Sequence, residues 1–248
     1  MSKRQTALIS GWSLIMMAIL AAFSFGYAFP EFYQPDQINS FKDNILNKKE
    51  LYRIMLIGGL LILILDLLVS YTLYCYFKND NNKISLASST LRIVYTLILG
   101  LATYYLTKNL SPIEFNSQLI VDNFKLFQLT WSAGLIIFGI HILLIGILMK
   151  LHNGIPKILW CLTLIAGVSY IAVHLLKLTN PNSEFVSTLE IILALPMAVG
   201  ELGLAIWLIV RGGKEIKPVT DKVLKLNVSA DSKDERNNFT TQVKTLNK

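Results

Sequence analysis

Six apolar segments, each long enough to cross a lipid bilayer, dominate the chain. A helix needs about 20 predominantly apolar residues to span the hydrocarbon core. Because lipid offers no water to exposed backbone groups, each such segment must satisfy its own hydrogen bonds as a helix. We therefore predict an all-α integral membrane protein, a six-transmembrane-helix bundle. The predicted spans are residues 7–29, 52–77, 85–107, 127–149, 156–177 and 187–210.

The composition agrees with this class. Hydrophobic residues make up 53% of the chain and charged residues 16%, and the mean hydropathy is +0.51; soluble domains usually carry about 25% charged residues. The net charge of +7 would suit a nucleic-acid-binding protein, but the basic residues concentrate in the predicted cytoplasmic loops and the C-terminal segment. We therefore expect the lipid bilayer as a partner, and not nucleic acid. The two cysteines, Cys75 and Cys161, lie in apolar runs without disulfide or zinc-site spacing.

The distribution of lysine and arginine predicts the orientation of the spans. The first span is too long for a signal-peptide core, so we interpret it as retained. With the N-terminus inside, the cytoplasmic segments hold more basic residues than the exterior ones, although the two sides are equal once the C-terminal segment is left out. We expect both termini to be cytoplasmic, in a bacterial inner membrane. The cytoplasmic set is Lys3, Arg4, Lys78, Lys83, Lys150, Lys157 and those from Arg211 onward; the exterior set is Lys42, Lys48, Lys49, Lys108, Lys125 and Lys177.

The composition changes sharply after Gly213. Residues 214–248 are rich in Lys, Asp, Asn, Thr and Ser and show no sustained apolar period, which is typical of disordered segments. We therefore predict a six-span transmembrane domain over residues 1–213 and a disordered cytoplasmic tail over residues 214–248. The two longer connections, residues 30–51 and 108–126, are both predicted outside, the first with a surface loop or a short interfacial helix.

Several ionisable side chains lie inside the predicted spans, where a charge costs about 2.5–3.5 kcal/mol on insertion scales and therefore needs a partner. Four of them come from four different helices. Counted from the predicted cytoplasmic ends at about 1.5 Å per residue, they fall within roughly 6 Å of one level, so we expect a polar cluster there. Two others, His174 and Glu190, lie nearer the outer face. The expected ligand-binding cluster comprises Asp66, Arg92, His141 and Glu201, with Tyr74 and Tyr95 in its lining.

Three interpretations of this cluster stay open. In a purely structural one, Asp66 pairs with Arg92, and His141 pairs with Glu201. In a second, the side chains line a cavity that binds a small molecule or relays protons, and this cavity reaches the cytoplasm or inner leaflet near His141. In a third, they form a metal-dependent or acid–base catalytic site with Asp66, His141 and Glu201 as candidate metal ligands, although His-rich sets are absent. The sequence indicates neither a cofactor nor an oligomeric state.

Several short stretches of the chain match a known pattern in order and spacing. They are LRIV at 91–94, FGIH at 138–141, GVSY at 167–170, GEL at 200–202 and AIWL at 205–208. Together they resemble the bacterial membrane family catalogued as domain of unknown function 4386, over roughly residues 5–213. The resemblance implies a single six-span domain and no assigned activity. It also implies an arginine, a histidine and a glutamate at the positions of Arg92, His141 and Glu201.

The function expected from these observations is that of a multi-pass membrane protein whose polar cluster binds a small molecule or a lipid. The alternatives are an intramembrane metal-dependent or acid–base enzyme and a transporter subunit. Transporters often carry inverted repeats or broken helices, and no repeat stands out in this chain. The chain contains no P-loop, G-x-S-x-G or H-E-x-x-H motif. These absences weaken the interpretation of the chain as a soluble-type nucleotide-binding protein, lipase or protease.

Overall fold

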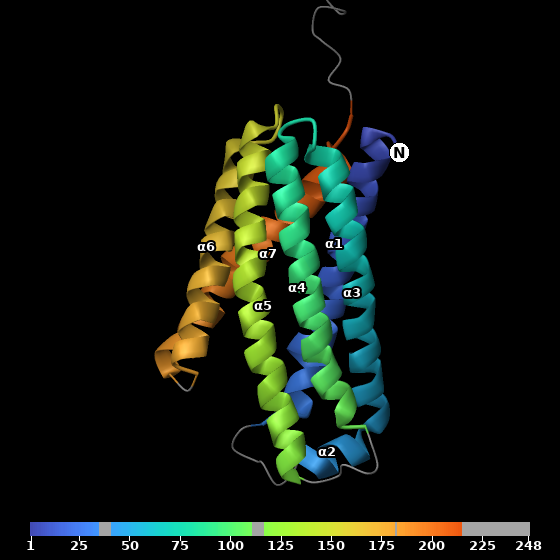
Figure 1. Cartoon of the computed structure of the whole chain (residues 1–248), viewed down its shortest axis with the longest axis vertical. Coiled ribbons are helices and arrows are strands. Elements are labelled where there is room, and N and C mark those ends of the chain that lie inside the picture. The colour runs from blue at the N-terminus through green and yellow to red at the C-terminus, as the bar shows by residue number, and fades with distance from the viewer. Residues whose placement is uncertain (35–40, 111–116, 182, 215–248) are drawn as a thin grey trace, which may run out of the picture. The chain divides into compact units, whose positions relative to one another are not determined.

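The structure, a computed structural model, describes residues 1–34, 41–110, 117–181 and 183–214. These residues hold six helices that are long and apolar enough to cross a membrane, and no strand. The predicted six-helix membrane bundle is therefore confirmed (Figure 1). The six long helices are α1 (Lys3–Ala21), α3 (Lys49–Phe77), α4 (Asn82–Lys108), α5 (Ser117–Leu151), α6 (Lys157–Thr179) and α7 (Glu184–Val210).

The first span changes its winding before it ends. α1 begins with a capping box between Ser2 and Gln5, which satisfies free backbone N–H groups at the helix start. It continues as a π-helix, η1 (Ala22–Ala28), and a short 3₁₀ turn, η2 (Phe29–Glu31). π-helical turns are rare and often lie at functional sites. Here the turn contains Phe25, which lines the cavity described below.

Two connections differ from a plain loop. The short helix α2 (Phe41–Asn47) lies in the connection between the first two spans, where a surface loop or interfacial helix was predicted. α5 begins at Ser117, well before the predicted residue 127. This first part of α5 is helical, but its hydropathy is lowered by Asp122, Asn123 and Lys125. The predicted span therefore begins after it.

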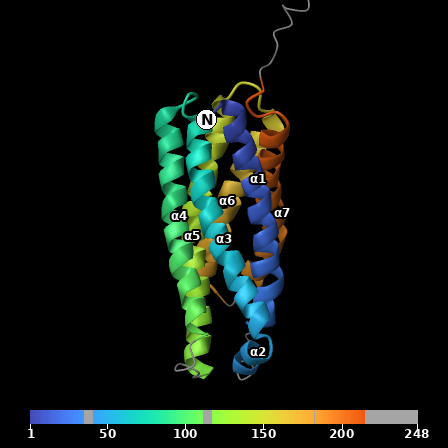
Figure 2. The ribbon, with the colours of Figure 1, turned by 90° about the vertical axis from the view of Figure 1, so that its right-hand side faces the viewer.

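The six long helices form a closed ring in which each packs against its neighbours in the sequence, and α7 packs against α1. Figures 1 and 2 show the helices running along one another, with the N-terminus and the end of α7 at the same end of the bundle. The short α2 packs against α3 and α5 at the opposite end. This ring order brings residues far apart in the sequence to one shared interior.

Glycines allow close contact between α5, α6 and α7. A Cβ atom on Gly139 would lie 2.9 Å from the carbonyl oxygen of Gly167, and a Cβ on Gly167 would lie 2.9 Å from that of Gly139. A Cβ on Gly200 would lie 2.7 Å from the Cβ of Ala166. Small residues commonly bring membrane helices together in this way. The close approach holds α7 against α6 at Gly200, directly before Glu201.

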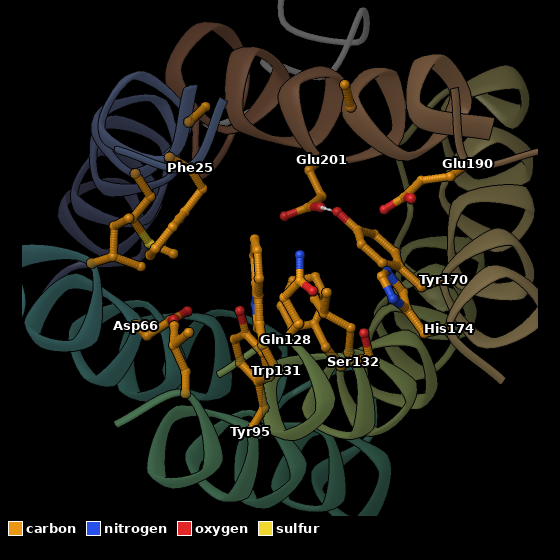
Figure 3. Close-up of a pocket in the computed structure, with 18 of the residues that line it drawn as sticks. Phe25, Asp66, Tyr95, Gln128, Trp131, Ser132, Tyr170, His174, Glu190 and Glu201 are labelled. Carbon is orange, nitrogen blue, oxygen red and sulfur yellow. Dashed lines mark hydrogen bonds between the residues drawn. The ribbon is translucent and has the colours of Figure 1, made fainter. Parts of the chain in front are cut away.

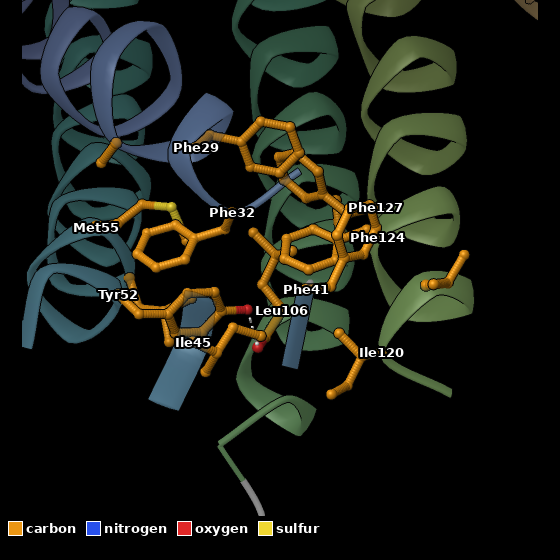
Figure 4. Packing of buried hydrophobic residues seen from close by; sticks show 14 residues of the cluster. Phe29, Phe32, Phe41, Ile45, Tyr52, Met55, Leu106, Ile120, Phe124 and Phe127 are labelled. Carbon is orange, nitrogen blue, oxygen red and sulfur yellow. Dashed lines mark hydrogen bonds between the residues drawn. The ribbon is translucent and has the colours of Figure 1, made fainter. Parts of the chain in front are cut away.

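Two apolar cores close the ends of the ring. One lies at the end that holds the N-terminus and includes Tyr76, Leu148 and Leu208. The other, at the α2 end, consists largely of aromatic rings, among them Phe41 and Phe124 (Figure 4). The ring interior between these cores is where the candidate site lies. The predicted tail, residues 214–248, lies outside the described residues except for Lys214, so the division into two domains stays a prediction.

Candidate functional site

A cavity of about 400 Å³ lies inside the helix ring. This volume falls in the range of roughly 300–1,000 Å³ typical of small-molecule sites. All six long helices contribute to its lining, and Figure 3 shows their side chains converging on the central space. Its walls are mostly aromatic and aliphatic, with a few polar groups among them. The polar and ionisable lining residues include Asp66, Tyr95, Gln128, Ser132, Tyr170, His174, Lys177, Glu190 and Glu201.

Arg92 connects three helices beneath the cavity. Its Nη2 and Nε atoms lie 2.6 Å and 2.9 Å from Oδ1 of Asp66, and its Nη1 atom lies 3.1 Å from Nε2 of His141. The guanidinium carbon also lies 5.3 Å from the centre of the Phe138 ring. Asp66 and Arg92 are both buried, with 0% and 1% of their side chains exposed. The charge of each side chain is therefore compensated by the other, as expected for a buried ion pair.

The hydrogen-bond partners of His141 determine its tautomer. A guanidinium group only donates, so Nε2 of His141 must accept from Arg92. Nδ1 lies 2.8 Å from the carbonyl oxygen of Ser88, which only accepts, so Nδ1 carries the proton and donates it. His141 is thus a neutral imidazole with both ring nitrogens engaged inside the protein. Its role in this arrangement is to position Arg92.

Glu201 is held by Tyr170 of α6. The Tyr170 hydroxyl donates a hydrogen bond of 2.5 Å to Oε1 of Glu201, and Figure 3 shows the second carboxylate oxygen pointing into the cavity. A second cavity, of about 10 Å³, lies between Glu201, Arg92 and His141, which is roughly the space that one water molecule needs. The proposed pairing of His141 with Glu201 is therefore not formed, because each has a different partner.

Three buried atoms of the lining lack a hydrogen bond among the described residues. They are Oδ2 of Asp66, Nε1 of Trp131 and Nδ1 of His174. Burying a polar group without a hydrogen bond costs about 1–3 kcal/mol in protein mutational data. Native proteins leave few such groups, so each one at a cavity indicates a partner that the folded chain does not itself supply.

The comparisons with known proteins agree with the fold. The family model described as "Domain of unknown function (DUF4386)" matches residues 9–212. The chain belongs to this family. An uncharacterized protein from Archaeoglobus fulgidus is 30% identical to it over 159 residues, which are 64% of this chain and 84% of that protein. No solved structure matches the chain. The matched region therefore contains all of the site residues, but the description of the family names no activity.

The outer part of the cavity of this DUF4386 chain carries an ion pair between α6 and α7. Nζ of Lys177 lies 2.8 Å and 2.9 Å from the two carboxylate oxygens of Glu190. The two side chains are 30% and 36% exposed, so the lining reaches the protein surface here. Glu190 thus pairs with Lys177, and His174, stacked on the ring of Tyr170, lies deeper.

Two expectations about this DUF4386 site need correction. Tyr74 does not line the cavity, because it lies near the end of α3, where its hydroxyl donates to Oδ1 of Asn82. The cavity itself extends from Asp66 and Glu201 toward the α2 end, as its lining by Phe29 shows, and not toward the N-terminal end near His141. The reason is that the large apolar core at the N-terminal end fills the ring below the Arg92 cluster.

The candidate metal ligands do not converge on one point. Arg92 stands between Asp66 and His141 and binds Oδ1 of the first and Nε2 of the second. Across residues 1–34, 41–110, 117–181 and 183–214, no three His, Cys, Asp or Glu side chains are placed to hold a metal ion.

Four lining residues of this DUF4386 domain were not singled out from the sequence: Gln128, Trp131, Ser132 and Tyr170. A signal for two of them is present. Gln128 and Ser132 are four residues apart in an apolar stretch, so they lie on one face of α5. Tyr170 has no comparable signal, because its contact with Glu201 depends on how α6 and α7 are rotated against each other.

Proposed function

We propose that this protein is a multi-pass protein of the bacterial inner membrane that binds a small molecule or a lipid in the cavity inside its helix ring. The observation that carries the proposal is the cavity with its polar groups. It combines a volume of about 400 Å³, a carboxylate oxygen of Glu201 directed inward and a buried oxygen of Asp66 without a partner.

The Arg92 cluster supports this proposal as a rigid base for the site. Its hydrogen bonds join α3, α4 and α5 at one level. Binding sites need side chains that are held in place by a second layer of contacts. A metal-dependent enzyme receives less support, because the Arg92 guanidinium lies between Asp66 and His141 and binds both.

The orientation with both termini in the cytoplasm is part of the same proposal. It rests on the distribution of lysine and arginine. The N-terminus and the end of α7 lie at one end of the bundle, as an even number of spans requires. In this orientation the cavity extends into the half of the membrane that faces the outside.

The test is native mass spectrometry of the full chain extracted from its own membrane. Ala21 lines the cavity, and Ala21→Phe would fill part of it with a ring. Ala194 is exposed on α7 and does not line the cavity, so Ala194→Phe adds the same ring outside. We expect a bound small molecule or lipid on the wild type and on Ala194→Phe, and its loss from Ala21→Phe. Identical spectra for all three proteins would contradict the proposal.

A further inference from the structure

We propose that the ligand of this cavity is an organic ammonium ion with an apolar substituent. This inference rests on the proposed function and names the chemical class that the site recognises. The free carboxylate oxygens, the uncompensated charge of Glu201 and the aromatic walls each favour a cationic ligand.

The positive groups at the cavity already have partners. Arg92 binds Asp66 and His141 and lies against the ring of Phe138. Lys177 binds both oxygens of Glu190. A phosphate, sulfate or carboxylate ligand would have to compete with Asp66 for the buried Arg92, which is strongly unfavourable, or with Glu190 for the partly exposed Lys177. An anion therefore finds no free positive partner among the described lining residues.

The negative groups, in contrast, keep free acceptor atoms. Glu201 uses one oxygen for the Tyr170 hydroxyl and directs the other into the cavity (Figure 3). Asp66 uses Oδ1 for Arg92, and its Oδ2 has no partner among the described residues. A carboxylate can only accept hydrogen bonds. A ligand that donates therefore satisfies these oxygens, and an ammonium group donates while supplying a positive charge.

With Glu201 ionised, the charges of the site balance when a cation is added. Asp66 is paired with Arg92, and Glu190 with Lys177. His141 is neutral by its hydrogen bonds. Glu201 has only the neutral Tyr170 as a partner and so remains the one uncompensated carboxylate of the described lining. A charge in the membrane interior calls for a counter-charge, which an ammonium ligand brings.

The aromatic walls suit a cation with an apolar body. The Phe25 and Trp131 ring centres lie 4.8 Å apart, and those of Tyr95 and Phe138 lie 4.7 Å apart, so the rings form continuous surfaces. Aromatic faces attract cations within about 6 Å of the ring, by about 2 kcal/mol or more where water is excluded. The same rings accept the apolar substituent of the ligand by ordinary burial.

Three compounds that share one skeleton separate charge from size: 4-phenylbutylammonium, 4-phenylbutanol and 4-phenylbutanoate. Their affinities are measured by isothermal titration on the full chain in lipid nanodiscs, with empty nanodiscs subtracted for membrane partitioning. We expect the ammonium ion to bind roughly ten- to hundredfold more tightly than the alcohol, as one charge-assisted hydrogen bond allows. The carboxylate should bind most weakly. This ranking on the wild-type protein depends on no variant.

The variant Glu201→Gln removes the charge and keeps the shape of the side chain. Glu184, an exposed carboxylate at the start of α7, does not line the cavity, so Glu184→Gln is the matched control. We expect Glu201→Gln to reduce the preference for the ammonium ion over the alcohol to near one, while Glu184→Gln leaves it unchanged.

The possible results separate the two proposals. Equal binding of the three compounds, or tightest binding of the carboxylate, overturns the ammonium inference. If Ala21→Phe abolishes that binding, the proposed cavity function stands. No binding of any compound, together with no bound molecule in native mass spectrometry, overturns both.

Discussion

Replacing Arg92 by methionine tests the most deeply buried interaction of the bundle. The change keeps much of the side-chain length and removes the guanidinium from Asp66 and His141, at contacts of 2.6 Å and 3.1 Å. Asp66 is 0% exposed, so its charge would remain buried without a counter-charge. Loss of one partner from a buried pair costs about 3–5 kcal/mol, and insertion scales give about 2.5–3.5 kcal/mol for an isolated charge. We expect a loss of about 3 kcal/mol in the free energy of unfolding.

The assay is reversible unfolding in mixed micelles as the fraction of dodecyl sulfate is raised. Arg53 provides the matched control, because its pairing with Glu50 is exposed and exposed pairs contribute about 1 kcal/mol or less. Arg53→Met should therefore change stability little. The double variant Asp66→Leu with Arg92→Met should recover part of the loss, since no charge is left alone. A change below about 1 kcal/mol for Arg92→Met would refute the reasoning.

Three further predictions concern the packing and the ends of the bundle. Gly167→Ala should destabilise the α5–α6 contact by about 1–3 kcal/mol in the same assay, because its Cβ would lie 2.8 Å from a Leu143 carbon; Gly26→Ala, with nothing within 4 Å, should cost nothing. Arg4→Gln should accelerate hydrogen exchange at the end of α7, because carbonyl oxygens in its last turn and directly after it accept three hydrogen bonds from Arg4; unchanged exchange would contradict this. Asn109→Ala should cost about 1–3 kcal/mol, because it removes a buried partner of the Tyr52 hydroxyl; stability equal to the wild type would contradict that role.

The fold was predictable because hydrophobic length and backbone chemistry leave few choices in a membrane. Six apolar segments led to six helices, and Asn153-Gly154 followed by Pro156 predicts a turn between the fourth and the fifth of them. The structure bears this out, since Gly154 has a φ of 103° and α6 begins directly after Pro156. The early start of α5 was missed, because its polar residues lower the hydropathy. One of them, Asn123, is buried through a hydrogen bond to Asn109 that no local pattern reveals.

The level of the site and the contact between Asp66 and Arg92 were predictable, but its other contacts were not. Depth along each helix brought Asp66, Arg92 and His141 to one layer, and the structure places them within hydrogen-bond distance. The partner of Glu201 depends on the rotation of α6 and α7, which glycines at their contact determine. Sequence periodicity says which residues share a face of one helix, but not which faces of different helices meet. Tyr170 was missed for that reason.

The central claim, an accessible cavity inside the helix ring, is most directly tested by cysteine accessibility. Gln128 lines the cavity, whereas the adjacent Leu129 is 56% exposed on the outer surface. Each is replaced by cysteine in a protein whose Cys75 and Cys161 are changed to alanine, and the protein in nanodiscs is treated with a positively charged methanethiosulfonate. A thiol reacts as the thiolate, which forms where water reaches it. We therefore predict that Gln128→Cys reacts and that 4-phenylbutylammonium protects it. Leu129→Cys, which faces the lipid, should stay unmodified. Equal reaction at both positions, or none at Gln128→Cys, would contradict the claim.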